Sequence, residues 1–203
     1  MKTTIAIPTD GLNVHGSRQG EWTVEDWERL PDDGNRYEII EGHLYMTTAP
    51  SSFHQWIVQQ LLLLIGAPAQ RQDTAFAFIA PIGVILPTGT AIQPDFLLVL
   101  KTQASIIRQR RIIGVPDLIV EVMSPGSAAY DEGIKLEACA EAGVPEYAVV
   151  DPANRQLRLY RLRSSGEYNA PLTYDEGDTL TFNAVPIALR VGDLFADAPD
   201  TTL

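Results

Sequence analysis

Two carboxylates lie inside segments that otherwise have the pattern of buried strands. Asp95 stands at the start of the apolar run Pro94–Leu100, and Glu121 lies within the β-branched run Leu118–Val122. A lone charge in such surroundings costs several kcal/mol unless a cation, a metal or a hydrogen-bond network compensates it. These two acids are therefore the first candidates for chemistry.

If the two strands pair, Asp95 and Glu121 lie side by side, and Glu38 in an earlier hairpin can join them. Carboxylate oxygens suit a hard divalent cation, Mg²⁺ or Mn²⁺, which takes one or two carboxylates and keeps waters for a substrate phosphate. The spacing also allows a simpler interpretation, in which each acid pairs with a nearby arginine or caps a turn. The spacing alone leaves both interpretations open.

The segment from Pro116 to Asp151 positions one of these acids. The run Leu118–Val122 is too short and too apolar for a surface helix, which predicts a strand buried on both faces. A Ser-Pro-Gly turn follows, then an amphipathic helix over residues 128–142 that carries Lys135, then a second buried strand, Tyr147–Val150. We expect this strand–turn–helix–strand unit to organise the rest of the chain.

The remaining elements follow from periodicity and turn chemistry. Thr23 is a cap for a short helix, Val24–Leu30, and Gly42 is a turn glycine between the strands of a hairpin. Ser51-Ser52 caps a helix from Phe53 to Ile65 that Gly66-Ala67-Pro68 should end. Further strands are expected at residues 4–7, 36–40, 44–47, 75–79, 83–86, 94–100, 157–162, 172–174, 180–182 and 187–191.

Composition limits the class of protein. The chain has 203 residues, of which 45% are hydrophobic, and these proportions predict an N-terminal arm over residues 1–20 and a single domain over residues 21–203. One cysteine excludes an intramolecular disulfide framework and a multi-cysteine zinc site. The longest apolar run, Leu61–Ile65, is too short to cross a membrane, so a cytoplasmic protein without membrane attachment is expected.

Charge is distributed unevenly along the chain. The net charge of −11 argues against a surface that coats nucleic acid in general, because such binding depends on neutralising phosphates. The segment from Lys101 to Arg111 is the exception, since it contains Arg108 and Arg110 as well and no acid. It is either a solvated loop or a local contact for a polyanion.

Four segments, in order, carry a family resemblance. They are YEIIEG from Tyr37, PDF from Pro94, EVMSP from Glu121, and YDEGIKLEACAEAGVPEYAVVDP from Tyr130. Together they resemble the Uma-two family of the PD-(D/E)xK restriction-endonuclease-like superfamily. The resemblance implies an α/β (α+β) fold, a mixed sheet flanked by helices, here with a C-terminal β extension. It also implies Mg²⁺ or Mn²⁺ held by Asp95 and Glu121, and hydrolysis of DNA phosphodiester bonds.

One position departs from the superfamily pattern. The lysine normally lies two residues beyond the second acid, but Met123 stands there, and a thioether cannot replace an ammonium. In the Uma-two pattern a lysine on the following helix takes over, and Lys135 is the candidate in this chain. The alternative is an Asp131–Lys135 surface pair, worth a few tenths of a kcal/mol and without catalytic meaning.

The resemblance and the residues together give a set of expected roles. The expected catalytic residues are Asp95, Glu121, Lys135 and Glu38, the metal ligands are Asp95, Glu121 and the Val122 carbonyl, and the substrate contacts are His54, Arg108, Arg110 and Arg111. The expected partners are DNA and a second copy of the chain. Two other functions stay open: a catalytically inactive dimeric interaction module, and a metal-dependent hydrolase of a smaller phosphate ester.

Overall fold

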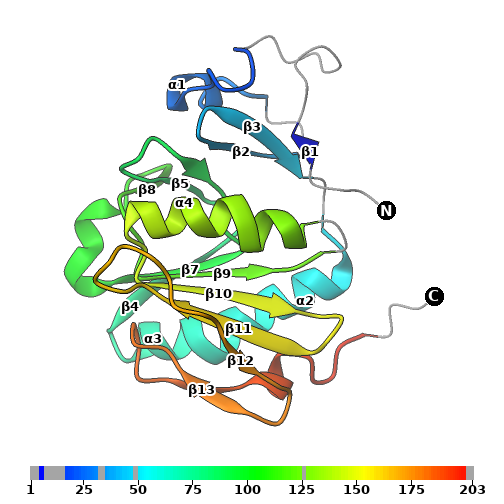
Figure 1. Ribbon diagram of the computed structural model, residues 1–203. Coiled ribbons are helices and arrows are strands. Elements are labelled where there is room, and N and C mark those ends of the chain that lie inside the picture. The colour runs from blue at the N-terminus through cyan, green and yellow to red at the C-terminus, as the bar shows by residue number, and fades with distance from the viewer. Residues whose placement is uncertain (1–4, 7–16, 32–34, 48–49, 125–126, 200–203) are drawn as a thin grey trace.

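The computed structural model describes residues 5–6, 17–31, 35–47, 50–124 and 127–199 (Figure 1). Within these residues the strands form two six-stranded sheets and one two-stranded sheet. The upper sheet of Figure 1 has the order β1 (Ile5–Ala6), β3 (His43–Thr47), β2 (Arg36–Ile40), β6 (Ala91–Ile92), β5 (Gly83–Ile85), β8 (Arg111–Ile113). The central sheet has the order β12 (Leu172–Tyr174), β11 (Gln156–Arg161), β10 (Glu146–Asp151), β9 (Leu118–Val122), β7 (Phe96–Leu100), β4 (Ala75–Ile79).

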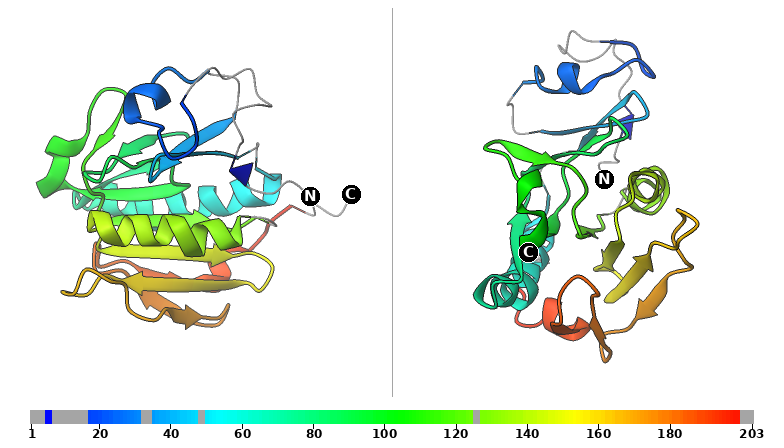
Figure 2. Two further views of the ribbon diagram at one scale, coloured as in Figure 1. Left: turned by 45° about the horizontal axis from the view of Figure 1, so that its top comes forward. Right: turned by 90° about the vertical axis from the view of Figure 1, so that its left-hand side faces the viewer.

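The central sheet is mixed, and both of its faces are covered. Strand β9 pairs parallel with β10 and antiparallel with β7, so the expected pairing of the two acid-bearing segments is present. One face packs against α2 (Ser52–Leu61), and the other packs against α4 (Lys135–Ala142) and the upper sheet (Figure 2). This arrangement confirms the expected mixed sheet flanked by helices.

Side-chain alternation decides which residues of each strand meet α4. Leu118, Val120 and Val122 point into the core on the α2 side, whereas Ile119 belongs to the core on the α4 side. Because successive side chains point to opposite faces of a strand, Glu121 shares the α4 side with Ile119. The same argument places Asp95, which precedes Leu97 by two residues, on that side.

The first long helix does not end where its sequence predicted. Ser51 caps α2 by accepting a hydrogen bond from the His54 N–H, but the chain continues through a π-helical turn, Leu62–Gly66, into α3 (Ala67–Arg71). In the π turn the Ala67 N–H reaches the Leu62 carbonyl, and Pro68 then falls in the first turn of α3, where its missing N–H is tolerated. The expectation that Gly66-Ala67-Pro68 ends the helix was therefore wrong.

The second long helix has the expected extent but is not regular. A π-helical segment, Tyr130–Ile134, precedes α4, and Gly133 within it has φ −121° and ψ −109°, which kinks the helix. Gly143, with φ 88°, ends α4 in the left-handed conformation common at helix C-termini. The kink sets the direction from which Lys135 approaches the central sheet.

The β2–β3 hairpin turns at Glu41-Gly42, both with positive φ. Gly42 has φ 72°, and a Cβ atom there would lie 2.5 Å from the Gly20 carbonyl oxygen, so the expected requirement for glycine is confirmed. The helix before it, α1 (Val24–Trp27), begins at the Thr23 cap as predicted but is shorter than the predicted Val24–Leu30.

Three further features complete the fold. A 3₁₀ helix spans Lys101–Ile106, where a basic loop was one expectation. The C-terminal extension adds β13 (Thr179–Thr181), β14 (Ala188–Arg190) and a 3₁₀ turn, Val191–Leu194, to the α2 side of the core. Within the described residues, no helix combines the length and apolarity that crossing a membrane requires.

Candidate active site

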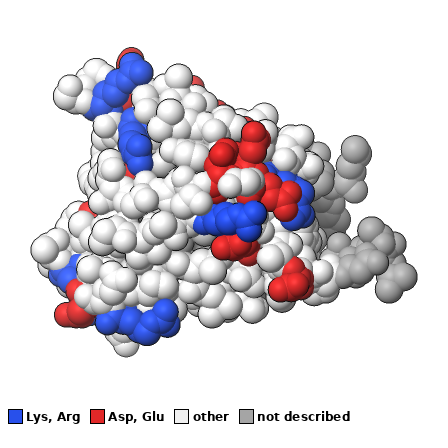
Figure 3. Space-filling view, turned by 90° about the horizontal axis from the view of Figure 1, so that it is seen from below, with Lys and Arg blue, Asp and Glu red and all other residues white. Residues whose placement is uncertain are grey.

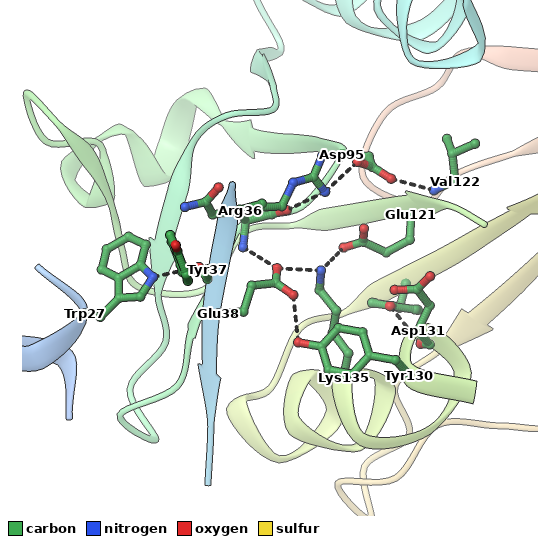
Figure 4. Close-up of polar contacts among 12 residues, drawn as sticks. Trp27, Arg36, Tyr37, Glu38, Asp95, Glu121, Val122, Tyr130, Asp131 and Lys135 are labelled. Atoms are coloured by element: carbon green, nitrogen blue, oxygen red, sulfur yellow. Dashed lines mark hydrogen bonds and ion pairs between the residues drawn. The ribbon is translucent and has the colours of Figure 1, made fainter. Parts of the chain in front are cut away.

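The four residues predicted to be catalytic come together between the upper and central sheets, on the α4 side of β7 and β9 (Figure 4). Glu38 comes from β2, Asp95 from the residue before β7, Glu121 from β9 and Lys135 from the start of α4. Each is at most 2% exposed. Four side chains that prefer water are thus held together where water is excluded, so their mutual contacts determine their states.

Lys135 lies between two carboxylates. Its Nζ is 2.9 Å from Glu121 Oε1 and 2.8 Å from Glu38 Oε1, and the side chain is 2% exposed. The alternative of an exposed Asp131–Lys135 pair is excluded, because both residues are buried. Burial alone would lower the pKa of Lys135, but Glu121, Glu38 and Asp131 outweigh that effect and raise it. Lys135 is therefore an ammonium and a donor.

Glu38 has hydrogen-bond partners within the protein on both carboxylate oxygens. Its Oε1 accepts the Gln93 N–H at 2.6 Å in addition to Lys135, and its Oε2 accepts the Tyr130 hydroxyl at 2.7 Å. Both oxygens are thus used within the protein. These contacts tie the upper sheet to the kinked helix and fix the position of the Lys135 ammonium.

Asp95 is hydrogen-bonded on both carboxylate oxygens. Arg36 Nη1 donates to Oδ1 at 2.8 Å, while the Val122 N–H donates to Oδ2 at 2.9 Å and His54 Nε2 lies 3.0 Å from the same oxygen. Burial would raise the pKa of Asp95, but the bond to His54, the Arg36 charge and the Val122 N–H outweigh it and hold the pKa well below its usual range. Asp95 is therefore ionised.

The centre has more buried negative charge than positive charge. Glu38, Asp95, Glu121 and Asp131 are buried there, and the permanent cations are Arg36 and Lys135. Burial, together with repulsion from Asp95, Asp131 and Glu38, raises the pKa of Glu121 well above its usual value despite the attraction of Lys135. Burial likewise raises the pKa of Asp131, to about 7. Four buried carboxyl groups thus share two permanent cations, and the raised pKa values of Glu121 and Asp131 reflect this imbalance.

The chain matches the model of a known protein family over most of its length. The family model described as "Uma2: Putative restriction endonuclease" matches residues 24–193, which include every residue of the centre. The chain belongs to the Uma2 family. This is the Uma-two family of the sequence resemblance, and its match extends further toward both termini than the four segments that first indicated it.

A solved structure supports the fold independently. It is a crystal structure described as that of a "putative nuclease belonging to DUF820" from Anabaena variabilis, with 19% sequence identity and a TM-score of 0.72. The similarity covers 85% of this chain and 97% of that one. No curated protein matches the Uma2 chain significantly. At this identity the likeness establishes the fold, and chemistry has to be argued from the residues.

The metal expected for a Uma2 protein can be tested against the donors present. Among the described residues, no three His, Cys, Asp or Glu side chains are grouped as a ready-made metal cluster. Asp95 and Glu121 are on one face of adjacent strands, and Glu121 Oε1 is buried without a hydrogen bond of good geometry, although Lys135 is close. The Val122 carbonyl faces the same neighbouring strand as its N–H, towards Asp95. Two carboxylates and a carbonyl fit a magnesium ion that keeps several waters.

The basic segment lies away from this centre. Lys101 follows the end of β7 opposite to Asp95, about 20 Å away at ~3.4 Å per strand residue. Lys101 pairs with Asp73 at 2.6 Å, and Arg111 pairs with Glu28 and lies over the Trp27 ring. Arg108 and Arg110 are exposed and have no side-chain partner among the described residues. Their contact with substrate stays a prediction.

Sequence reasoning missed two members of the centre, Arg36 and Tyr130. Arg36 shares the face of β2 with Glu38 and Ile40, so period-two alternation from Glu38 could have identified it. Tyr130 opens the family segment YDEG, but nothing in its spacing indicates that its hydroxyl reaches Glu38. Tyr147 belongs to the core on the α4 side, and Asp151 accepts hydrogen bonds from the N–H groups of the turn after β10.

Proposed function

We propose that this Uma2 protein is a metal-dependent endonuclease that hydrolyses phosphodiester bonds in DNA. The observation that supports the proposal best is the buried group of Asp95, Glu121 and Lys135, which has the residue types that such chemistry needs, with Lys135 Nζ 2.9 Å from Glu121 Oε1. The family is described as one of restriction endonucleases and the Anabaena protein as a nuclease, and both descriptions favour the same reaction class.

Asp95, Glu121 and the Val122 carbonyl would hold Mg²⁺ or Mn²⁺. When bound there, such a cation lowers the pKa of its water and offsets charge on the phosphate. Asp95 is prepared for this role because its hydrogen bonds keep it ionised. Glu121 differs from Asp95, because burial raises its pKa. The positive charge of a bound cation would keep Glu121 ionised.

Lys135 acts as a donor and an electrostatic stabiliser in this proposal. As an ammonium it orients the attacking water or offsets negative charge that builds up on the phosphate, and it cannot act as the general base. Glu38 is a positioning residue: it holds Lys135 at 2.8 Å and is itself held by Tyr130. His54 orients Asp95 through Nε2, and its Nδ1 is buried without a partner.

DNA has to approach an acidic protein. Arg108 and Arg110 are exposed cations free to contact the phosphate backbone outside the cleavage site. Because they are exposed on the segment just before β8, whereas the centre is buried, we assign them to long-range attraction of the duplex and chemistry to the centre. Charge reversal at both arginines should slow association at low salt without changing single-turnover cleavage of bound DNA.

The decisive experiment is cleavage of supercoiled plasmid and of single-stranded DNA with Mg²⁺, Mn²⁺ or excess EDTA. Wild type should cleave only with metal, and Asp95→Asn, Glu121→Gln and Lys135→Met should each reduce the rate by ~100-fold or more. Lys101→Met is the matched control, since this lysine is partly exposed and distant from the centre.

Each open alternative gives a different result. If wild type cleaves no DNA but hydrolyses bis(p-nitrophenyl) phosphate with the same mutational pattern, the substrate is a smaller phosphate ester. If neither is hydrolysed by folded protein with metal, the chain is an inactive interaction module and the nuclease proposal is wrong.

A further inference from the structure

Arg36 differs from Lys135, the other permanent cation of the centre, because several of its N–H donors make no hydrogen bond. Its Nη1 donates to Asp95 Oδ1 at 2.8 Å and to the Gln93 carbonyl at 3.3 Å. Its Nε and Nη2 make no hydrogen bond within the described residues. Three N–H groups, along one edge of a planar guanidinium, are therefore unmatched.

The guanidinium also remains accessible. The Arg36 side chain is 19% exposed, compared with 2% for Lys135. A guanidinium keeps its positive charge throughout the physiological pH range. A partly accessible cation with unused donors, held to Asp95 through Nη1, is suited to bind an anion (Figure 4).

A second unmatched polar group lies on the same face. Thr47 pairs with Arg36 across the β2–β3 ladder, so their side chains point to the same side of the sheet. Thr47 Oγ1 is buried and has no hydrogen-bond partner among the described residues. Buried polar atoms are nearly always paired in folded proteins, so an unpaired hydroxyl beside an unpaired guanidinium edge suggests a missing ligand.

We infer that Arg36 binds a non-bridging oxygen pair of a substrate phosphodiester. The Nε–Nη2 edge matches two phosphate oxygens, the geometry for which arginine is preferred over lysine. Arg36 then contacts the substrate on the Asp95 side of the centre and Lys135 acts on the Glu121 side. This inference rests on the proposed function for its substrate, and the competing explanation is that Arg36 serves only as the counter-ion of Asp95.

The test uses a labelled duplex with phosphorothioate linkages, bound in Ca²⁺ at several salt concentrations by wild type, Arg36→Gln, Arg36→Lys and the exposed control Arg163→Gln. Arg36→Gln should weaken binding about tenfold and reduce the slope of log K against log salt by about one. Arg36→Lys should keep the slope but lose part of the affinity. Arg163→Gln should match wild type.

A second readout does not depend on cleavage or on folding of a variant. In wild type, the ¹⁵N–¹H signal of Arg36 Nε should shift when the dinucleotide TpT is added, while that of Arg163 should not. If plasmid is cleaved but the Arg36 signal and the salt slope do not change, Arg36 is a counter-ion only and the inference is overturned. If TpT shifts Arg36 in a protein that cleaves no DNA, the phosphodiester site stands and the nuclease proposal fails.

Discussion

Lys135 tolerates full burial only because two carboxylates share its charge. Taking an ammonium out of water costs several kcal/mol, and its contacts with Glu38 and Glu121 offset this cost. The reverse also holds: without Lys135, the two carboxylates would face each other with no cation of their own. Each partner of this ion-pair cluster is therefore needed for the stability of the others.

Lys135→Met should accordingly reduce the free energy of unfolding by ~3 kcal/mol or more in metal-free buffer at neutral pH, because it leaves uncompensated buried charge. Lys101→Met removes a partly exposed cation paired with Asp73 and should cost less than ~1 kcal/mol. Urea unfolding followed by circular dichroism measures both. Equal losses for the two variants would contradict the ion-pair account.

The acids and the lysine were predictable as residues, but their partners were not. Asp95 and Glu121 stood out as charges in apolar strands, and Lys135 was indicated by Met123 at the usual lysine position. Arg36 and Tyr130 join the centre only because the upper sheet packs over the central one, which is a tertiary fact with no local sequence signal. The same fact gives Glu38 a positioning role, which its place in a hairpin did not suggest.

At the scale of elements, the β2–β3 hairpin positions Arg36 and Glu38, so its turn matters to the centre. Gly42→Ala should destabilise the protein by ~2 kcal/mol or more, since it combines positive φ with a clash against the Gly20 carbonyl. Gly89→Ala is the matched control: its φ is +83° with open space around the new Cβ, so only the conformational cost of ~1 kcal/mol applies. Thermal and urea unfolding report the difference.

The turn after β10 provides a pH-dependent contribution. Asp151 accepts hydrogen bonds from the Ala153 and Asn154 N–H groups, and its pKa is lowered because these bonds, the Asn154 side chain and Arg158 outweigh the effect of burial. A lowered folded-state pKa stabilises the fold above the unfolded value of ~4, and this contribution is lost as the pH falls through the folded-state pKa.

Asp151→Ala should therefore cost ~1–2 kcal/mol at pH 7, and the difference from wild type should shrink steadily below about pH 4. Urea midpoints measured between pH 7 and pH 2.5 test the sign. A difference that grows towards acid pH would show that the Asp151 carboxylate is not stabilising.

The ends of helices and strands were predictable where a capping or turn residue is present. They were not predictable where the chain continues as a helix through residues that usually end one. Thr23, Ser51 and Gly42 mark real element ends because their side chains or dihedral angles act locally. Gly66-Ala67-Pro68 has the composition of a helix end, yet a π turn moves proline into a tolerated position. The kink at Gly133 in the second helix was not expected, because the helical pattern of the segment gives no local sign of it.

At the scale of the whole molecule, charge is spread so that no broad basic surface is evident on the face shown in Figure 3. Lys and Arg on that face are scattered or lie beside acids. One such pair in the structure joins Arg155, just before β11, to Glu176 at 2.6 Å. With a net charge of −11, DNA affinity should depend on few contacts and fall with salt less steeply than for a strongly basic protein. Specific contacts at the centre then matter more than general attraction.

If the proposed centre cuts one strand at a time, the expected homodimer has a kinetic consequence. If two copies act together, supercoiled plasmid should be converted to linear product with little accumulation of nicked circles. A monomer should accumulate nicked circles first. Gel analysis of the time course, together with sedimentation velocity at the same concentration, distinguishes the two, and a monomer would contradict the expected dimer.

The contact between Lys135 and Glu38 joins residues 97 positions apart in the sequence, one at the start of α4 and the other in β2. A chain emerging from the ribosome thus holds Glu38 and Asp95 well before Lys135, the lysine proposed to act with them. A partly folded chain whose upper sheet has not docked lacks Arg36 and Glu38 at the centre as well. A protein that cuts DNA in this way would be harmless until synthesis and folding are both complete.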